Sequence, residues 1–194
     1  ALIAESKRTI AVGGTSGKST TSAMLFHILE QAGLQPSIIS GAGLTSIIKE
    51  GKIGNAKVGA GDWLVIEADE SDGSIVQYHP EVGLLLNIDK DHQEIDELIS
   101  IFTIFKNNTS RLFIVNQSNA LARKLSANVQ NDFSVEMPAG FIATGFAQNG
   151  FHISFEVEGV KFSLNAIGKH SMENALAATA VAATAACPPA RRPA

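Results

Sequence analysis

Short apolar runs alternate with stretches of helical spacing through the first two thirds of the chain. The runs are continuous, which is typical of strands buried on both faces of a parallel sheet. This pattern predicts an α/β fold built on a doubly wound, mostly parallel sheet flanked by helices. We expect strands at Arg8–Val12, Ser37–Ser40, Trp63–Ile66, Val82–Leu86 and Leu112–Val115, and helices at Ser19–Ala32, Glu94–Phe105 and Asn119–Leu125.

The pattern changes in the last third of the chain. Apolar and polar residues alternate over Phe151–Val157 and again over Val160–Leu164, with a Glu-Gly pair between the two runs. Such a pattern predicts a β-hairpin, and therefore a small antiparallel appendage beside the main sheet. The sequence then becomes rich in alanine. We expect a helix over Ser171–Ala186, with the serine as its N-cap, ended by Pro188 and Pro189.

Composition excludes several classes of protein. The chain has 194 residues, of which 45% are hydrophobic, enough for the core of a soluble domain. A net charge of -4 without a basic run leaves no electrostatic footprint for nucleic acid. No apolar run approaches the roughly 20 residues that cross a bilayer, so no membrane span is expected. A single cysteine, Cys187, excludes an internal disulfide framework and suits a cytoplasmic protein.

The first candidate site is a glycine-rich stretch, GGTSGKSTT, at residues 13–21. It lies between a predicted strand and a predicted helix, where glycines let backbone N–H groups approach phosphate oxygens. Lys18 is placed to neutralise the terminal phosphates, and the Ser19 hydroxyl is placed to bind Mg²⁺. Val12 stands where the usual phosphate-loop spacing has a glycine, so the stretch follows a shorter pattern. An ordinary glycine-rich turn is the alternative.

Two further strands end in polar clusters. The run WLVIEADESD, at residues 63–72, ends in carboxylates, of which Glu67 comes first and Glu70 is a close rival as a ligand for Mg²⁺. The next strand is followed by Asn87, Asp91 and His92. Because ligands of an open α/β sheet gather at the carboxyl ends of its strands, we expect these groups to converge on the glycine-rich loop. A solvated acidic loop and an incidental loop histidine are the alternatives.

These motifs resemble those of the Mur ligase family, within the superfamily that includes folylpolyglutamate synthetases. The loop GGTSGKSTT matches the family's short phosphate-loop pattern, EADESD at residues 67–72 resembles the members that add L-alanine or a murein peptide to UDP-N-acetylmuramate, and NIDKDH at residues 87–92 matches the family's Asn-Ile-x-x-Asp-His. The segment GKHSMENALAA, at residues 168–178, is similar to the family's adenosine-binding segment. The resemblance runs from Thr9 to about Ala186.

The resemblance implies a nucleotide site that binds ATP and Mg²⁺. It implies that Lys18, Glu67 and His92 act in catalysis, with Ser19, Glu67, Glu70 and His92 as metal ligands. The residues implied in binding the nucleotide are Gly14, Thr15, Ser16, Gly17, Lys18, Ser19, Thr20, Asn87, His170 and Asn174.

The resemblance also implies an activity and partners. Residues 1–194 correspond to the central, ATP-binding domain of a peptidoglycan-precursor ligase, and we expect an N-terminal UDP-sugar-binding domain and a C-terminal ligase domain outside this chain. The substrates implied are UDP-N-acetylmuramate and L-alanine or a peptide, joined through an acyl phosphate. Two alternatives stay open. One is a folylpolyglutamate-type ligase, and the other is a non-catalytic nucleotide-binding module, since Ser16 and Ser171 replace common family residues.

Overall fold

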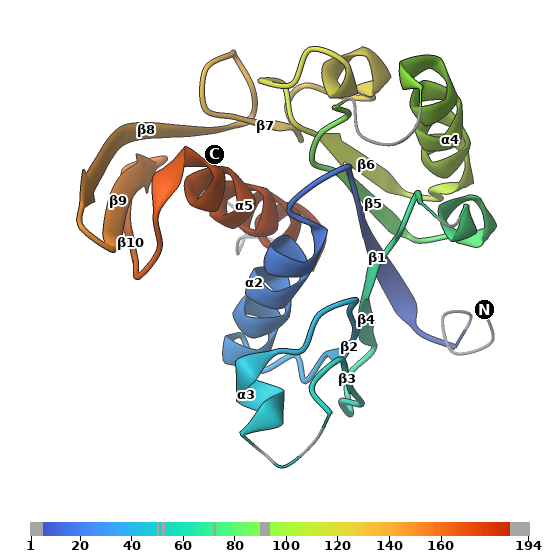
Figure 1. Ribbon diagram of the computed structural model, residues 1–194, viewed down its shortest axis with the longest axis horizontal. Coiled ribbons are helices and arrows are strands. Elements are labelled where there is room, and N and C mark those ends of the chain that lie inside the picture. The colour runs from blue at the N-terminus through green and yellow to red at the C-terminus, as the bar shows by residue number, and fades with distance from the viewer. Residues whose placement is uncertain (1–5, 50, 52, 72, 90–93, 187–194) are drawn as a thin grey trace, which may run out of the picture.

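The computed structural model describes residues 6–49, 51, 53–71, 73–89 and 94–186, which form two sheets with helices packed against them (Figure 1). The six-stranded sheet has the order β3-β2-β4-β1-β5-β6. Its neighbours pair in parallel except β3, which runs antiparallel to β2 at the edge. The strands are β1 (Arg8–Gly13), β2 (Ser37–Ile39), β3 (Ala56–Lys57), β4 (Trp63–Glu67), β5 (Val82–Leu85) and β6 (Leu112–Val115).

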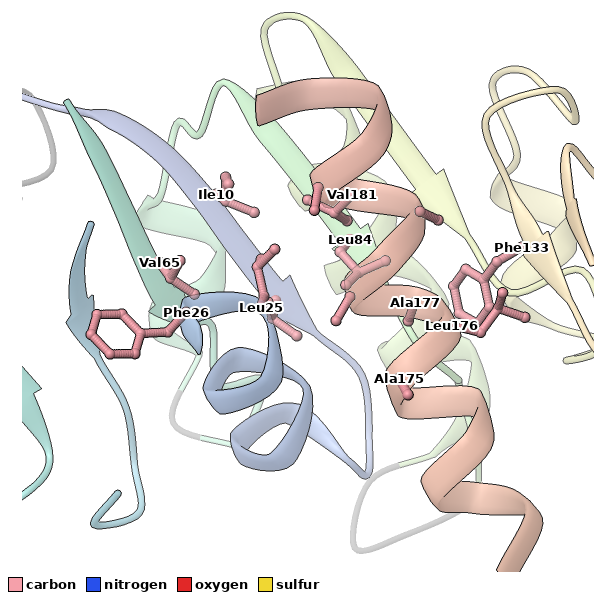
Figure 2. Close-up of a cluster of buried hydrophobic side chains, with 14 of the residues drawn as sticks. Ile10, Leu25, Phe26, Val65, Leu84, Phe133, Ala175, Leu176, Ala177 and Val181 are labelled. Atoms are coloured by element: carbon pink, nitrogen blue, oxygen red, sulfur yellow. The ribbon is translucent and has the colours of Figure 1, made fainter. Parts of the chain in front are cut away.

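Both faces of the parallel sheet are buried, as its continuous apolar strands predict. On one face, α2 (Lys18–Gln31) and α5 (Gly168–Val181) cover Ile10, Val65 and Leu84 (Figure 2). On the other face, α4 (Ile95–Asn108) and the short 3₁₀ helix η1 (Ser74–Gln77) cover alternate residues of the same strands. The strands β4, β1, β5 and β6 lie between two helical layers and run in parallel, so their carboxyl ends lie on one edge, where the loops leave.

The second sheet packs against α5 and has the order β10-β9-β8-β7. The predicted hairpin is confirmed as β9 (His152–Val157) and β10 (Val160–Leu164). Glu158 and Gly159 both have positive φ, 49° and 79°, as a tight two-residue turn requires. The phenyl rings of Phe155 and Phe162 stack across the pair with centroids 5.1 Å apart. Two strands that the sequence did not reveal complete the sheet, β7 (Phe133–Ser134) and β8 (Phe141–Asn149).

The predicted fold class is confirmed, and two details of it are wrong. The segment Asn119–Leu125 is not a helix: only the 3₁₀ turn η2 (Ala122–Leu125) forms, because the Asn119 side chain accepts hydrogen bonds from the first backbone N–H groups. The last helix begins at Gly168, and Ser171 is not its N-cap, since its hydroxyl donates to the carbonyl of Ile167.

The connection after β2 contains one helical turn, α3 (Thr45–Ile48). At the other end of the chain, α5 continues into a π-helical turn, η3 (Ala182–Ala186). Cys187 and the two prolines expected to end this helix lie outside the described residues. Among the described residues, no helix combines the length and the apolar character needed to cross a bilayer.

Candidate active site

Two glycines with positive φ shape the loop between β1 and α2. Gly14 has a φ of 139° and Gly17 a φ of 84°. A Cβ atom on Gly14 would lie 3.0 Å from Cβ of Leu86, and one on Gly17 would lie 2.6 Å from Oδ1 of Asn174 on α5. A side chain at either position would strain the backbone and displace a neighbouring element. The loop is therefore fitted between the end of β5 and the first turns of α5.

Asn87, just beyond β5, holds this loop in place. Its Oδ1 accepts hydrogen bonds from Thr15 Oγ1 at 2.8 Å and from the Ser16 N–H at 2.9 Å, and its Nδ2 donates to the Ser16 carbonyl at 3.1 Å. The Thr15 hydroxyl also accepts from the N–H of Asp89 at 3.0 Å. Asn87 therefore positions the loop, whereas its contact with a nucleotide stays a prediction.

Lys18, the first residue of α2, folds back into an acidic pocket. Its Nζ donates to the Gly14 carbonyl at 2.9 Å and to Glu70 Oε2 at 2.8 Å, with Asp69 Oδ1 at 3.8 Å. The Lys18 and Glu70 side chains are only 12% and 7% exposed. Glu70, predicted as a metal ligand, thus lies in direct contact with the ammonium group.

Glu67 lies at the carboxyl end of β4 and meets α2 there. Ser19 Oγ donates to its two carboxylate oxygens at 2.9 and 3.0 Å. Its Oε2 also accepts from Ser40 Oγ at 3.1 Å and from the Gly41 N–H at 2.7 Å. These contacts fix the carboxylate beside the serine hydroxyl, as the sequence predicts for a shared magnesium site.

The donor set at this position fits Mg²⁺. Mg²⁺ prefers oxygen ligands and is usually bound through one or two carboxylates, with water and substrate phosphates supplying the rest. Ser19 and Glu67 offer a hydroxyl and a carboxylate in contact with each other. Among the described residues, no group of three or more acidic, histidine or cysteine side chains forms a metal cluster of its own. A magnesium ion here would share its coordination with a bound phosphate.

The N-terminus of α2 opens onto a cavity of about 240 Å³. No side chain caps this helix end, and its first turn has no acidic residue. The first backbone N–H groups of a helix have no partner within the helix and carry a positive partial charge, so they favour an anion. The residues that line the cavity are Thr15, Ser16, Gly17, Lys18, Ser19, Thr20 and Glu67.

A second cavity, of about 250 Å³, lies on the other side of Ser16 and reaches the start of α5. His170 and Glu173 line it, and His170 Nδ1 lies 3.5 Å from Glu173 Oε2. Burial raises the pKa of Glu173, and the nearby His170 opposes the rise. Asn116, at the end of β6, is 5% exposed and forms part of the wall. The two cavities share Ser16 in their walls, and the second extends from the loop to α5.

The structure brings together most of the predicted site residues. The glycine-rich loop with the start of α2, the end of β4 and the end of β5 converge on one edge of the sheet. Hydrogen bonds join them in the pairs Ser19–Glu67, Lys18–Glu70 and Thr15–Asn87. Asn174 reaches the loop from α5, and His170 lies one turn earlier on the same helix. Asp91 and His92 lie outside the described residues, so their predicted role at a second metal ion stays a prediction.

Sequence reasoning missed the groups that hold Glu67 and that wall the second cavity. Ser40 and Gly41 follow β2 directly, so their place at a carboxyl strand end was the available signal. Asn116 and Asn119 follow β6 in the same way. Asn119 Oδ1 accepts from the Ile88 N–H at 3.3 Å and so joins this loop to the end of β5.

Comparison with known proteins agrees with this geometry. Residues 12–182 match the family described as the Mur ligase middle domain. A UDP-N-acetylmuramate–L-alanine ligase from Synechocystis sp. is 35% identical over 190 residues, which cover 93% of this chain and 36% of that protein. The chain thus spans little more than a third of that relative's length.

Solved structures show the same fold. The UDP-N-acetylmuramate–alanine ligase of Thermotoga maritima superposes with a TM-score of 0.80 at 26% identity, over 93% of this chain and 42% of that one. The MurF ligase of the same organism, whose structure is a complex with ADP, superposes with a TM-score of 0.69 at 18% identity, over 92% of this chain and 45% of that one. With the glycine-rich loop, the acidic strand end and these matches together, the chain belongs to the Mur ligase family and corresponds to its middle domain.

Proposed function

We propose that this chain is the ATP-binding part of a ligase that makes a peptidoglycan precursor. The single observation that carries the proposal is the meeting of Lys18, Ser19 and Glu67 at the open N-terminus of α2. A cation, a hydroxyl, a carboxylate and unpaired backbone N–H groups are the parts that a magnesium–triphosphate complex requires. That a MurF ligase of the same fold was solved in complex with ADP supports a nucleotide as the ligand.

Each residue has a distinct task in this proposal. Gly14 to Thr20 wrap the phosphates, with Lys18 offsetting the charge of the terminal ones and Asn87 holding the loop. Ser19 and Glu67 hold Mg²⁺, which when bound offsets phosphate charge. His170, which lines the second cavity, and Asn174, which lies against Gly17 of the loop, face the adenosine. His92 binds a second Mg²⁺, as the family pattern implies.

The reaction would form an amide bond in two steps. A carboxylate oxygen of UDP-N-acetylmuramate bonds to the γ-phosphorus of ATP as the bond to ADP breaks, which gives an acyl phosphate. The amine of the second substrate then bonds to the acyl carbon, phosphate leaves and the amine loses a proton. Lys18 and the helix N-terminus contribute by positioning and by stabilising charge on the transferred group.

L-Alanine is our preferred amine, because the Synechocystis relative carries that name. A peptide amine is the second candidate. We expect the sugar nucleotide and the amine to be held by flanking domains, since the chain spans 36% of that relative. We expect the reaction to take place in the cytoplasm, the compartment that a single cysteine suits.

Calorimetry on this chain tests the nucleotide site directly. ADP titrated in the presence of excess Mg²⁺ should give saturable heat with a dissociation constant in the micromolar to millimolar range, about 10⁻⁵ to 10⁻³ M. A folded chain that takes up no ADP at millimolar concentration would contradict the proposal.

Phosphate release by the longer polypeptide that carries this segment tests the reaction. UDP-N-acetylmuramate with ATP should release phosphate when L-alanine is added. Release with a murein tripeptide alone would move the assignment to the peptide-adding subfamily, and release with a folate and glutamate would move it to the folylpolyglutamate type. Cells that grow normally with Lys18→Ala in the same polypeptide would favour the non-catalytic module.

A further inference from the structure

The pairing of Lys18 with Glu70 suggests a role for Glu70 that its place in the acidic motif did not indicate. The two side chains come from α2 and from the loop after β4, and their charged atoms are 2.8 Å apart. Both are largely buried, at 12% and 7% exposure. Removing one partner of such a pair is costly, because the other charge is left in a poorly solvated place. In the free protein this contact therefore holds the ammonium group of the phosphate loop.

Three acidic side chains gather near the start of α2. The Lys18 ammonium lies 2.8 Å from Glu70 and 3.8 Å from Asp69, and the next residue, Ser19, contacts the Glu67 carboxylate. Polyphosphate is itself anionic, and charges of like sign a few ångströms apart repel strongly where water is partly excluded. A nucleotide without a divalent cation therefore meets an ammonium that is already paired with Glu70, and its phosphates come close to carboxylates.

Glu70 and Glu67 hold different partners. Glu67 contacts Ser19, the hydroxyl of the magnesium position, and is fixed from its other side by Ser40 and Gly41. Glu70 contacts the ammonium of Lys18. The two carboxylates thus divide the site into a metal side and a lysine side.

We propose that Glu70 is a displaceable counter-ion of Lys18, a positioning residue that makes nucleotide binding depend on Mg²⁺. In the free protein Glu70 keeps the ammonium folded back on the loop. The phosphates take over Lys18 only when divalent cations arrive with them and compensate the carboxylates. The inference rests on the proposed nucleotide site, and it assigns to Glu70 the selection of magnesium-bound over metal-free nucleotide.

The variant Glu70→Gln, compared with Asp69→Asn, tests the proposal by calorimetry with ADP. Both substitutions remove one negative charge, but Asp69 lies 3.8 Å from Nζ and is 47% exposed, so it serves as the matched control. With EDTA present, Glu70→Gln should bind ADP about tenfold more tightly than the unmodified chain, and Asp69→Asn less than about threefold more tightly. With excess Mg²⁺, Glu70→Gln and the unmodified chain should agree within about threefold.

Three results would overturn the counter-ion role. If Glu70→Gln leaves metal-free affinity unchanged and weakens binding with Mg²⁺, Glu70 is a metal ligand only. If metal-free affinity falls, its role is to support the loop. If Asp69→Asn raises the metal-free affinity for ADP as much as Glu70→Gln does, the negative charge of the whole acidic loop is responsible, and the contact between Glu70 and Lys18 is not. Thermal melting of each variant shows that the compared chains are folded.

A second measurement keeps the proposal testable without any nucleotide. Acetylation of Lys18 by an activated ester, followed by peptide mass spectrometry, reports how firmly Glu70 holds the ammonium, with the exposed Lys161 as internal reference. The Lys18 rate should rise at least about threefold in Glu70→Gln and change little in Asp69→Asn. Equal rates in the unmodified chain and Glu70→Gln would overturn the inference. Absence of ADP binding with a raised rate would instead overturn the proposed nucleotide site.

Discussion

The two edges of the parallel sheet both carry ion pairs and cavities, and they use them differently. At the carboxyl edge, Lys18 and Glu70 are buried together beside a cavity of about 240 Å³. At the amino edge, Glu81 lies between Arg8 at 2.7 Å and Arg111 at 2.5 Å, beside a cavity of about 460 Å³. Arg8 also stacks on the ring of Trp63, 4.0 Å from its centroid. The larger cavity therefore lies at the amino edge, where the ion pairs of Glu81 connect the starts of neighbouring strands.

The difference shows that convergence of unlike groups marks a site better than volume does. The amino edge pairs side chains that are 22 to 47% exposed, and such pairs contribute little to stability or binding. The carboxyl edge gathers a cation, carboxylates, a hydroxyl and a helix N-terminus. Parallel strands send all their carboxyl ends there, and α2 adds its positive end.

The largest expected effect comes from removing the ammonium at the carboxyl edge. Lys18→Ala should weaken the binding of ADP with Mg²⁺ at least about 100-fold, because the phosphates lose their cation. It should also lower the free energy of unfolding by about 1–3 kcal/mol, since Glu70 is left buried without this partner. Calorimetry and urea unfolding measure the two effects.

Two controls belong with Lys18→Ala. The double variant Lys18→Ala/Glu70→Gln should recover the lost stability and not the lost affinity. Arg111→Ala, at the amino edge, should change ADP affinity less than about twofold. Equal losses of affinity in Arg111→Ala and Lys18→Ala would remove the distinction between the edges.

The next effect concerns the fit of the loop against α5. Gly17→Ala places a Cβ atom 2.6 Å from Asn174 Oδ1 at a residue with a φ of 84°. We expect about tenfold weaker ADP binding and a loss of about 1–2 kcal/mol in the free energy of unfolding. Gly150→Ala is the matched control, because its φ is 58° and no atom lies within 4 Å of the added Cβ. That variant should show the backbone strain alone, with ADP affinity intact.

A smaller effect is expected at the residue that holds the loop from β5. Asn87→Ala removes three hydrogen bonds to Thr15 and Ser16, so ADP affinity should fall about three- to tenfold. Asn108→Ala, which removes a hydrogen bond to the Val76 carbonyl on the α4 side, is its control. Urea unfolding should show both variants to be destabilised, while calorimetry should separate them. Unchanged affinity in Asn87→Ala would mean that the loop keeps its shape without this amide.

The smallest effect lies at the amino edge and depends on pH. The pKa of Glu81 is lowered from its ordinary 4.5, mainly by the hydrogen bond that Arg8 donates. The positive charge of Arg8 and the contact with Arg111 lower it further. A depressed pKa in the folded state contributes stability that is present above the unfolded value and is lost as the pH falls through the folded value. Glu81→Gln should thus be less stable than the unmodified chain at pH 7, by at most about 1 kcal/mol. Urea unfolding should show this gap closing below pH 4.5, and a gap that stays constant in acid would contradict the assignment.

The elements that the sequence predicted well are those with one dominant local signal. The continuous apolar strands and the long amphipathic helix of residues 95–108 appear close to their expected bounds. β8 escaped because a bulge between Thr144 and Ala147 interrupts its alternation, and only Ala143 of this strand is buried. The helix expected over Asn119–Leu125 failed because Asn119 directs its side chain to the local backbone.

The site follows the same division. The spacing of GGTSGKSTT and of the acids after β4 predicted that these side chains lie at one edge, since parallel topology sends all of them there. The partner of each carboxylate was not predictable. Glu67 and Glu70 are three positions apart in one acidic run, and only their three-dimensional positions assign one to Ser19 and the other to Lys18.

The amino-acid sequence by itself determined the family, the α/β architecture and several of the residues at the carboxyl edge, because strand patterning and loop chemistry are local properties of the chain. Only the tertiary structure decided how those residues are paired. Lys18 and Glu70 are 52 positions apart, and Thr15 and Asn87 are 72 apart. Contacts over such separations depend on how strands are ordered in the sheet and on where each loop leaves it, and neither is encoded in any single segment.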